Sequence, residues 1–135
     1  MCSRRVCVLA GLLLLTLTGC IPVGDVKSNE TDVPFSELTT HASKYTGQRI
    51  CTQGVYLSAF EINALAASTY QRDGATYLTE PTIWIEGTNF ALSSDCITSD
   101  TRPPMKFCQA RVCGLFEAGG SYGHLGGYPY QIEAR

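Results

Sequence analysis

The chain has 135 residues, of which 44% are hydrophobic, 10% aromatic and 16% charged. This composition excludes an intrinsically disordered chain, and the length allows one folded domain with a single hydrophobic core. The formal net charge is −2. A nucleic-acid-binding protein normally presents a basic face to the phosphates, so the charge balance argues against that class.

The first twenty residues carry the features of a targeting signal. Arg4 and Arg5 precede an apolar run over residues 6–17. This run is shorter than the roughly 20 residues that a membrane-spanning helix needs. The run ends in Leu17-Thr18-Gly19-Cys20, which resembles the lipobox of bacterial lipoproteins. The resemblance implies cleavage before Cys20 and a lipid on its sulfur. An ordinary signal peptide, a short membrane anchor and a twin-arginine signal are the alternatives.

The domain organisation follows from this signal. We expect a signal peptide over residues 1–19, a lipidated Cys20 with a flexible tether over residues 20–34, and one domain over residues 35–135. Cleavage leaves 8 basic against 12 acidic residues. Ile21 stands where lipoproteins retained at the inner membrane commonly carry Asp, so the resemblance favours the outer membrane. The expected location is the cell envelope, facing the periplasm and anchored in the membrane through the lipid.

The cysteines fit an oxidising compartment. Three of the seven either leave with the signal or carry the lipid. The four that remain are Cys51, Cys96, Cys108 and Cys113. An even number predicts two disulfides. The polar, proline-containing segment between Cys96 and Cys108 resembles a loop that a bridge would close, which favours Cys96–Cys108 and therefore Cys51–Cys113. Four free thiols or a zinc site are the alternatives, and the absence of a C-x-x-C pair argues against zinc.

The domain is expected to begin with a helix over residues 35–45, capped at its N-terminus by Ser36. A long strand over residues 48–60 follows, and Gly54 interrupts its alternation as at a bulge or a sharp bend. Residues 61–69 are ambiguous between a short helix and a loop elaboration.

Further strands are expected beyond this point. Gln71-Arg72-Asp73-Gly74 is a turn signal. The later strands are predicted over residues 75–79, 82–86, 106–116 and 128–134. The glycine-rich segment over residues 117–127 is expected to be a loop. In the last strand Tyr128, Tyr130 and Ile132 are expected to share one face, because alternate side chains of a strand point the same way.

These elements predict a mainly β fold with about five strands and a short N-terminal helix. Glycine-bent strands at this spacing favour a small closed barrel of the OB type, with a small β-sandwich as the alternative. A Cys51–Cys113 bridge would join the first and fourth strands of such a barrel. The segments Gly47–Ile50, Gly54–Tyr56 and Gly114–Ala134 resemble small, largely uncharacterised bacterial lipoproteins with an OB-like domain. That resemblance implies a fold and an envelope location but no substrate.

The sequence offers no catalytic motif. His41 and His124 are the only histidines, and Gly119-Gly120-Ser121-Tyr122-Gly123 matches G-x-S-x-G only inside a glycine-rich segment. The spacing of the carboxylates does not indicate that any two of them flank a cleft, as the catalytic pair of a glycoside hydrolase would. We therefore predict a protein that is not an enzyme and has no metal or cofactor. A small hydrolase acting on envelope material is the less favoured alternative.

His124, in the segment before the last strand, is the strongest single candidate for a binding residue. Its aromatic neighbours in sequence are Tyr122, Tyr128 and Tyr130, and Trp84 is predicted to face away from Ile83 and Ile85. These five side chains, Trp84, Tyr122, His124, Tyr128 and Tyr130, are the predicted ligand-binding set. They favour a module that binds an envelope protein or polymer, with no nucleic acid as partner. A structural subunit that docks in a larger envelope complex is the alternative.

Overall fold

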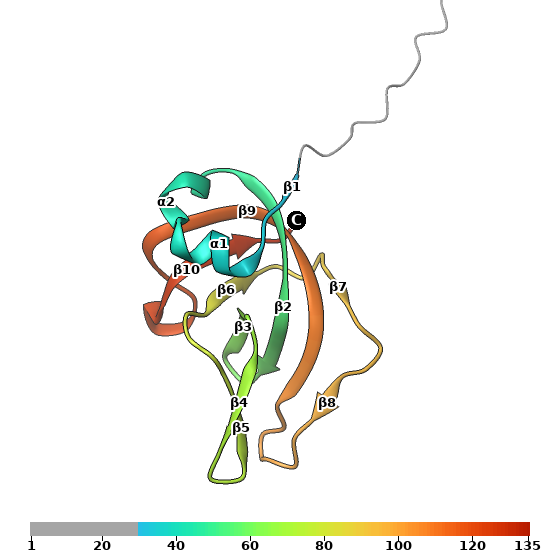
Figure 1. The fold of residues 1–135 in the computed structure, drawn as a ribbon. Coiled ribbons are helices and arrows are strands. Elements are labelled where there is room, and N and C mark those ends of the chain that lie inside the picture. The colour runs from blue at the N-terminus through green and yellow to red at the C-terminus, as the bar shows by residue number, and fades with distance from the viewer. Residues whose placement is uncertain (1–29) are drawn as a thin grey trace, which may run out of the picture.

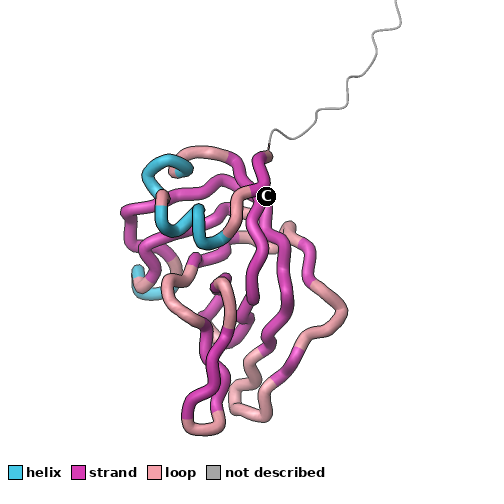
Figure 2. Tube along the Cα trace, in the orientation of Figure 1, coloured by secondary structure: helices cyan, strands magenta, loops and turns pink. Residues whose placement is uncertain are grey.

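The computed structural model describes residues 30–135 (Figure 1). The predicted signal peptide, Cys20 and most of the predicted tether lie outside the described residues. The described part is mainly β, with two short α-helices near its start (Figure 2). The predicted fold class is therefore confirmed at this level.

The chain enters the fold through a short strand, β1 (Thr31–Asp32), which pairs in parallel with the next long strand. Two helices follow, α1 (Phe35–Thr40) and α2 (Ala42–Tyr45), where one was predicted. The break lies at His41, whose φ of −117° and ψ of 40° are not helical. Ser36 is not the N-cap, because α1 begins one residue earlier and its cap position carries no side-chain hydrogen bond.

Five of the strands pair in a closed circuit (Figure 1). They are β2 (Arg49–Ala59), β3 (Ile62–Ala66), β6 (Ile83–Glu86), β9 (Lys106–Tyr122) and β10 (Tyr128–Glu133). β2 pairs with β3, β3 with β6, β10 with β9, and β9 with β2, all antiparallel. The remaining pair, β6 with β10, is parallel. Each of the five strands therefore has a neighbour on both sides.

The described residues form more strands than the five that were predicted. β4 (Thr69–Arg72) and β5 (Ala75–Leu78) make a separate hairpin, while β7 (Ala91–Leu92) and β8 (Ile97–Thr98) pair with β9. The ambiguous segment after β2 is largely strand β3. The predicted glycine-rich loop was wrong over residues 117–122, because that segment pairs with β10 as the end of β9.

Gly54 and Gly114 explain how the two long strands change neighbours. β2 gains β3 as a partner at Val55, and β9 gains β10 at Leu115, one residue after each glycine. A Cβ at Gly54 would collide with the backbone carbonyl of Ala66, and one at Gly114 with that of Glu133. The register of β2 on β9 runs without a shift through Gly54, so the predicted irregularity is a close backbone approach and not a bulge.

The core fills the inside of the circuit. Its members come from all five strands of the circuit, and α1 contributes Leu38. The core side chains with no exposed surface include Leu38, Ile50, Leu65, Ile83, Val112, Phe116 and Ile132. Burial of a side chain of this size contributes about 1.5–3 kcal/mol, so this cluster is the main source of stability.

Two disulfides hold the long strands to their surroundings. Cys51 is bonded to Cys113, its direct partner across β2 and β9, with Cα atoms 4.0 Å apart. Cys96 is bonded to Cys108 and ties the β7–β8 segment to β9. The structure thus contains the pairing that the sequence analysis favoured.

Candidate binding groove

A groove lies on the outer face of the strand circuit. Leu57, Ala64 and Trp84 are cross-strand partners on β2, β3 and β6. Their sequence neighbours Leu65 and Ile83 belong to the core. Because side chains alternate along a strand, Leu57, Ala64 and Trp84 project outward. Leu57 and Ala64 therefore form the floor of an outer surface.

The β4–β5 hairpin supplies one wall of this groove. Tyr70 and Tyr77 are directly opposite each other in the hairpin, so both rings project from the same face. Their ring centroids lie 5.5 Å apart in a stacked arrangement, and both rings remain exposed. The groove has a volume of about 400 Å³. Its lining consists of Leu57, Ile62, Ala64, Tyr70, Tyr77, Leu78, Glu80, Thr82, Gly127 and Tyr128.

Trp84 and Tyr128 form an aromatic pair beside the groove. Their ring centroids are 5.2 Å apart, and the Trp84 indole donates a hydrogen bond of 2.9 Å to Glu86 Oε2. The prediction that Trp84 faces away from Ile83 and Ile85 is confirmed. The side chain is nevertheless only 9% exposed, because the Gly123 backbone and the Tyr128 ring cover it. Trp84 therefore supports the groove by packing against Tyr128 and does not line it.

Tyr128 and Tyr130 lie on different faces, so the prediction of a shared face was wrong. Tyr130 stacks on Phe116 in the core at 6.0 Å and donates a hydrogen bond to the carbonyl oxygen of Thr39. Tyr128 lines the outer groove. The pairing with β9 shifts register between Tyr128 and Tyr130. A bulge at this point turns the first residue outward.

Among the described residues, Glu80 is the only charged side chain that lines the groove. Its Oε2 accepts a hydrogen bond of 3.3 Å from the Thr82 hydroxyl. Burial raises the pKa of the Tyr128 hydroxyl, and the negative charge of Glu80 raises it further. Tyr128 is therefore neutral at physiological pH.

His124 joins two loops next to the groove. It opens the short 3₁₀ helix η1 (His124–Gly126), and its Nε2 lies 3.2 Å from Glu61 Oε2 in the turn between β2 and β3. Leu125 is 91% exposed and Phe60 is 71% exposed on these same two loops. His124 does not line the groove. Its contact instead holds the β2–β3 turn against the loop that precedes β10.

The predicted ligand-binding set is thus only partly brought together. Tyr128 lines the groove, Trp84 supports it, and His124 lies on an adjoining loop. Tyr122 is half-buried on β9, with its ring against Gly120, and is not part of the groove lining. Tyr130 is directed toward the core.

The prediction missed Tyr70 and Tyr77, which are the most accessible rings of the groove. The sequence did carry a signal for them. Asp73-Gly74 is typical of a two-residue hairpin turn, and extending the pairing outward from it sets Tyr70 opposite Tyr77. We predict from the sequence the turn and a strand over residues 75–79 but no strand before the turn, so Tyr70 is not paired with Tyr77 in that prediction.

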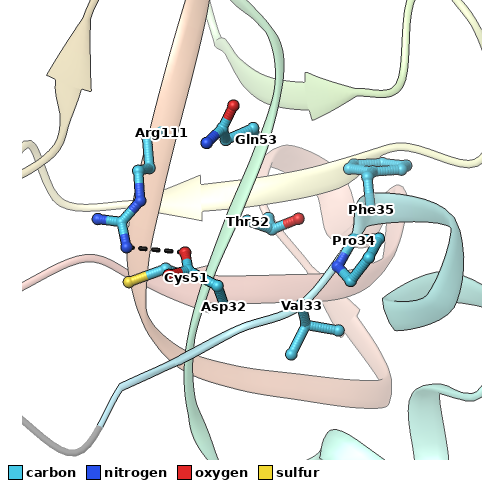
Figure 3. A pocket seen from close by; sticks show the side chains of 8 residues that line it. All are labelled: Asp32, Val33, Pro34, Phe35, Cys51, Thr52, Gln53 and Arg111. Atoms are coloured by element: carbon cyan, nitrogen blue, oxygen red, sulfur yellow. Dashed lines mark hydrogen bonds and ion pairs between the residues drawn. The ribbon is translucent and has the colours of Figure 1, made fainter.

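A second hollow of about 440 Å³ lies where β1 meets β2 (Figure 3). Arg111 spans it by donating a hydrogen bond of 2.8 Å to Asp32. Thr52 lies among its lining residues, but its hydroxyl is buried and has no hydrogen-bond partner among the described residues. That hydroxyl is inaccessible, and the two charged residues of the lining, Asp32 and Arg111, are already paired with each other.

One group of side chains has the spacing of metal ligands. Glu30 lies close to the sulfurs of Cys51 and Cys113, with all three ligand atoms within 4.8 Å of one another. The two sulfurs are bonded to each other. A disulfide provides no thiolate, which is the form of cysteine that binds metal. This group therefore leaves a single carboxylate and does not make a metal site.

Comparisons with protein-family models, with curated proteins and with solved structures found no match. Within residues 30–135, no helix has the length and apolar character needed to cross a membrane.

Proposed function

We propose that this chain is a membrane-anchored lipoprotein of the bacterial envelope whose OB-like domain binds an envelope protein or polymer without catalysing a reaction. The observation that carries the proposal is the outer-face groove, in which Tyr70, Tyr77 and Tyr128 surround an apolar floor. Tyrosine is enriched in binding surfaces because it combines a large apolar ring with a hydrogen-bonding group.

The strand pairing supports the OB assignment. The circuit β2–β3–β6–β10–β9 returns to β2, and its one parallel pair joins the third and fifth of these strands in chain order. OB domains bind ligands on the face of their second and third strands, flanked by the loops after the first and fourth strands. Those elements correspond here to β3, β6, the turn at Phe60 and Glu61, and the loop at residues 123–127. The groove lies on this face.

The surroundings of the reactive side chains support a role without catalysis. All four cysteines of the described residues are in disulfides. His41 lies 3.0 Å from the Glu37 carboxylate, and His124 lies 3.2 Å from the Glu61 carboxylate. A nucleophilic dyad needs a Ser or Cys within hydrogen-bond reach of the base. In residues 30–135 neither histidine has a serine or cysteine side chain as a hydrogen-bond partner.

The position of the groove supports a role for an anchor at Cys20. β2 pairs with β1 at Ile50 and Cys51, where the chain enters the domain, and Leu57 lies about 20 Å further along the strand. A lipid upstream of β1 would therefore leave the groove at the end of the domain that is distant from the membrane. A partner in the envelope would then have free access to it.

Photo-crosslinking in intact cells tests this proposal. The full-length protein carries a photo-reactive amino acid in place of Tyr77 and, as a matched control, in place of the exposed Thr88 between β6 and β7. We expect a discrete light-dependent adduct from position 77 and none from position 88. Equal adducts from both positions, or an adduct from position 88 alone, would contradict the proposal.

The exposed side chains of Phe60 and Leu125 favour a second candidate, a structural subunit docked in a larger envelope complex. These two apolar residues lie on loops that the His124–Glu61 contact joins. A photo-reactive residue at position 125 separates the two candidates. A strong adduct from position 125 with none from position 77 would favour docking over groove binding.

A further inference from the structure

We propose that the groove binds a cationic group, namely a lysine or arginine side chain on a basic segment of a partner protein. This inference rests on the proposed function and specifies the chemistry of the ligand. It is carried by the combination of three tyrosine rings and one unpaired carboxylate around the same hollow.

The aromatic lining provides the first part of the argument. Tyr70 and Tyr77 are stacked on the hairpin, and Tyr128 faces the same hollow from the start of β10. The faces of aromatic rings carry negative electrostatic potential and attract ammonium and guanidinium groups. Ile62 and Leu78, which are half-buried in the lining, offer an apolar surface for the methylene groups of a long basic side chain.

The carboxylate provides the second part. Glu80 lines the groove, and its hydrogen bond within the described residues comes from the neutral Thr82 hydroxyl. No lysine or arginine among residues 30–135 forms an ion pair with Glu80 or lines this groove. Six other carboxylates of the described part do have a basic partner within 4 Å, either a histidine or a lysine or arginine. Glu80 is therefore free to pair with a cation from outside.

Other ligand classes match the lining less well. An acidic peptide or a nucleic acid would be repelled by Glu80, because no lining residue carries a positive charge. An uncharged glycan would stack on the tyrosines but would gain nothing from the charge of the carboxylate. The charge therefore favours a basic peptide over a glycan.

The test uses full-length protein extracted from membranes in a non-ionic detergent. Trp84 is the only tryptophan of the chain and lies against Tyr128, so its fluorescence reports ligand binding at the groove. The probes are hexalysine, the same peptide with every side chain acetylated, and the neutral glycan cellohexaose. We expect a saturable change in fluorescence with hexalysine and none with the two neutral probes.

Two variants test which side chains of the groove bind the cation. Glu80→Gln removes the charge, and Tyr77→Leu replaces one exposed ring with an aliphatic side chain. Each should raise the Kd for hexalysine about fivefold or more, since a cation over an aromatic ring and a charged hydrogen bond each contribute roughly that much. Asp100→Asn is the matched control, because it removes the same charge from an exposed site outside this groove and should change the Kd less than twofold.

Several outcomes would overturn the inference. Equal weakening by Asp100→Asn and Glu80→Gln would mean attraction to the net charge and not to the groove. Binding of cellohexaose or of the acetylated peptide as tight as that of hexalysine would mean a neutral ligand. A crosslink from position 77 without hexalysine binding would reject the cationic ligand and keep the groove, whereas absence of both would reject the groove as well.

Discussion

Gly123 shows how one backbone position shapes the groove. Its φ is +68°, a region that L-residues rarely adopt, and its backbone lies on the Trp84 indole. A Cβ at this position would lie 2.5 Å from Trp84 Cδ2 and 2.8 Å from Tyr128 Cδ2. The loop before β10 can cover the aromatic pair only because this residue has no side chain.

The variant Gly123→Ala should therefore be less stable, both because alanine disfavours the positive φ and because its Cβ would clash with the two rings. We expect a decrease in the free energy of unfolding of about 2–4 kcal/mol, from the positive φ together with overpacking against the rings. Gly119→Ala is the matched control, because φ there is +82° with nothing within 4 Å of the added Cβ. It should cost only about 1 kcal/mol. Urea unfolding measures both, and equal losses would mean that contact with the rings is unimportant.

Tyr128 also predicts a pH dependence. Burial and then Glu80 raise the pKa of its hydroxyl in the folded state above that of the unfolded chain. The folded state thus holds the proton more tightly, and the stability this provides is present below about pH 10 and is lost as the pH rises through the folded pKa. The free energy of unfolding should fall above pH 10. Tyr128→Phe should show a shallower fall, and an unchanged slope would contradict the assignment.

At the scale of elements, β2 and β9 share one design. Each strand carries a cysteine followed by a glycine that admits a second neighbouring strand: Cys51 and Gly54 in β2, Cys113 and Gly114 in β9. The two cysteines are direct partners, so the disulfide joins the two strands near one end of their paired stretch. Both strands contain the same tripeptide pattern of Arg, an apolar residue and Cys, which reflects this arrangement in the sequence.

The two disulfides should differ in their effect on stability. Cys51–Cys113 spans 62 residues and Cys96–Cys108 spans 12. The loss of loop-closure entropy in the unfolded chain then predicts about 4 kcal/mol for the first and about 3 kcal/mol for the second. The double variant Cys51→Ala/Cys113→Ala should unfold at a lower urea concentration than Cys96→Ala/Cys108→Ala. The reverse order would show that contacts of the β7–β8 segment outweigh chain entropy.

At the scale of the whole molecule, β1 and the β4–β5 hairpin, which forms one wall of the groove, lie at opposite ends of the fold (Figure 1). Val33 and Phe35, close to the point of entry, contribute to the core. The Arg49–Glu30 and Arg111–Asp32 ion pairs attach the first described residues to β2 and β9. The domain is thus attached firmly at the end where a lipid on Cys20 would hold it.

The intact mass of protein extracted from membranes tests the anchor. We expect a mass that lacks residues 1–19 and includes acyl chains, with four thiols alkylated only after reduction. Cys20→Ala should abolish both cleavage and acylation and release the protein from lipid-dependent membrane attachment. A full-length mass without lipid, or thiols that react before reduction, would reject the predicted location and disulfide state.

Several features could be predicted from the sequence because they depend on residues near one another. The strands β2, β6 and β10 follow from their apolar and β-branched content, and the loop between Cys96 and Cys108 indicated which cysteines pair. The turn at Asp73-Gly74 is equally local, and with it the pairing of Tyr70 and Tyr77 could have been inferred.

The tertiary structure alone decided where the aromatic residues lie. A register shift between Tyr128 and Tyr130 sends one ring to the groove and the other to the core, and strict alternation cannot foresee it. The groove itself combines a hairpin, β3 and the start of β10, which meet only because the strand circuit places them together. Local patterns specify elements, whereas a binding surface depends on which distant elements become neighbours.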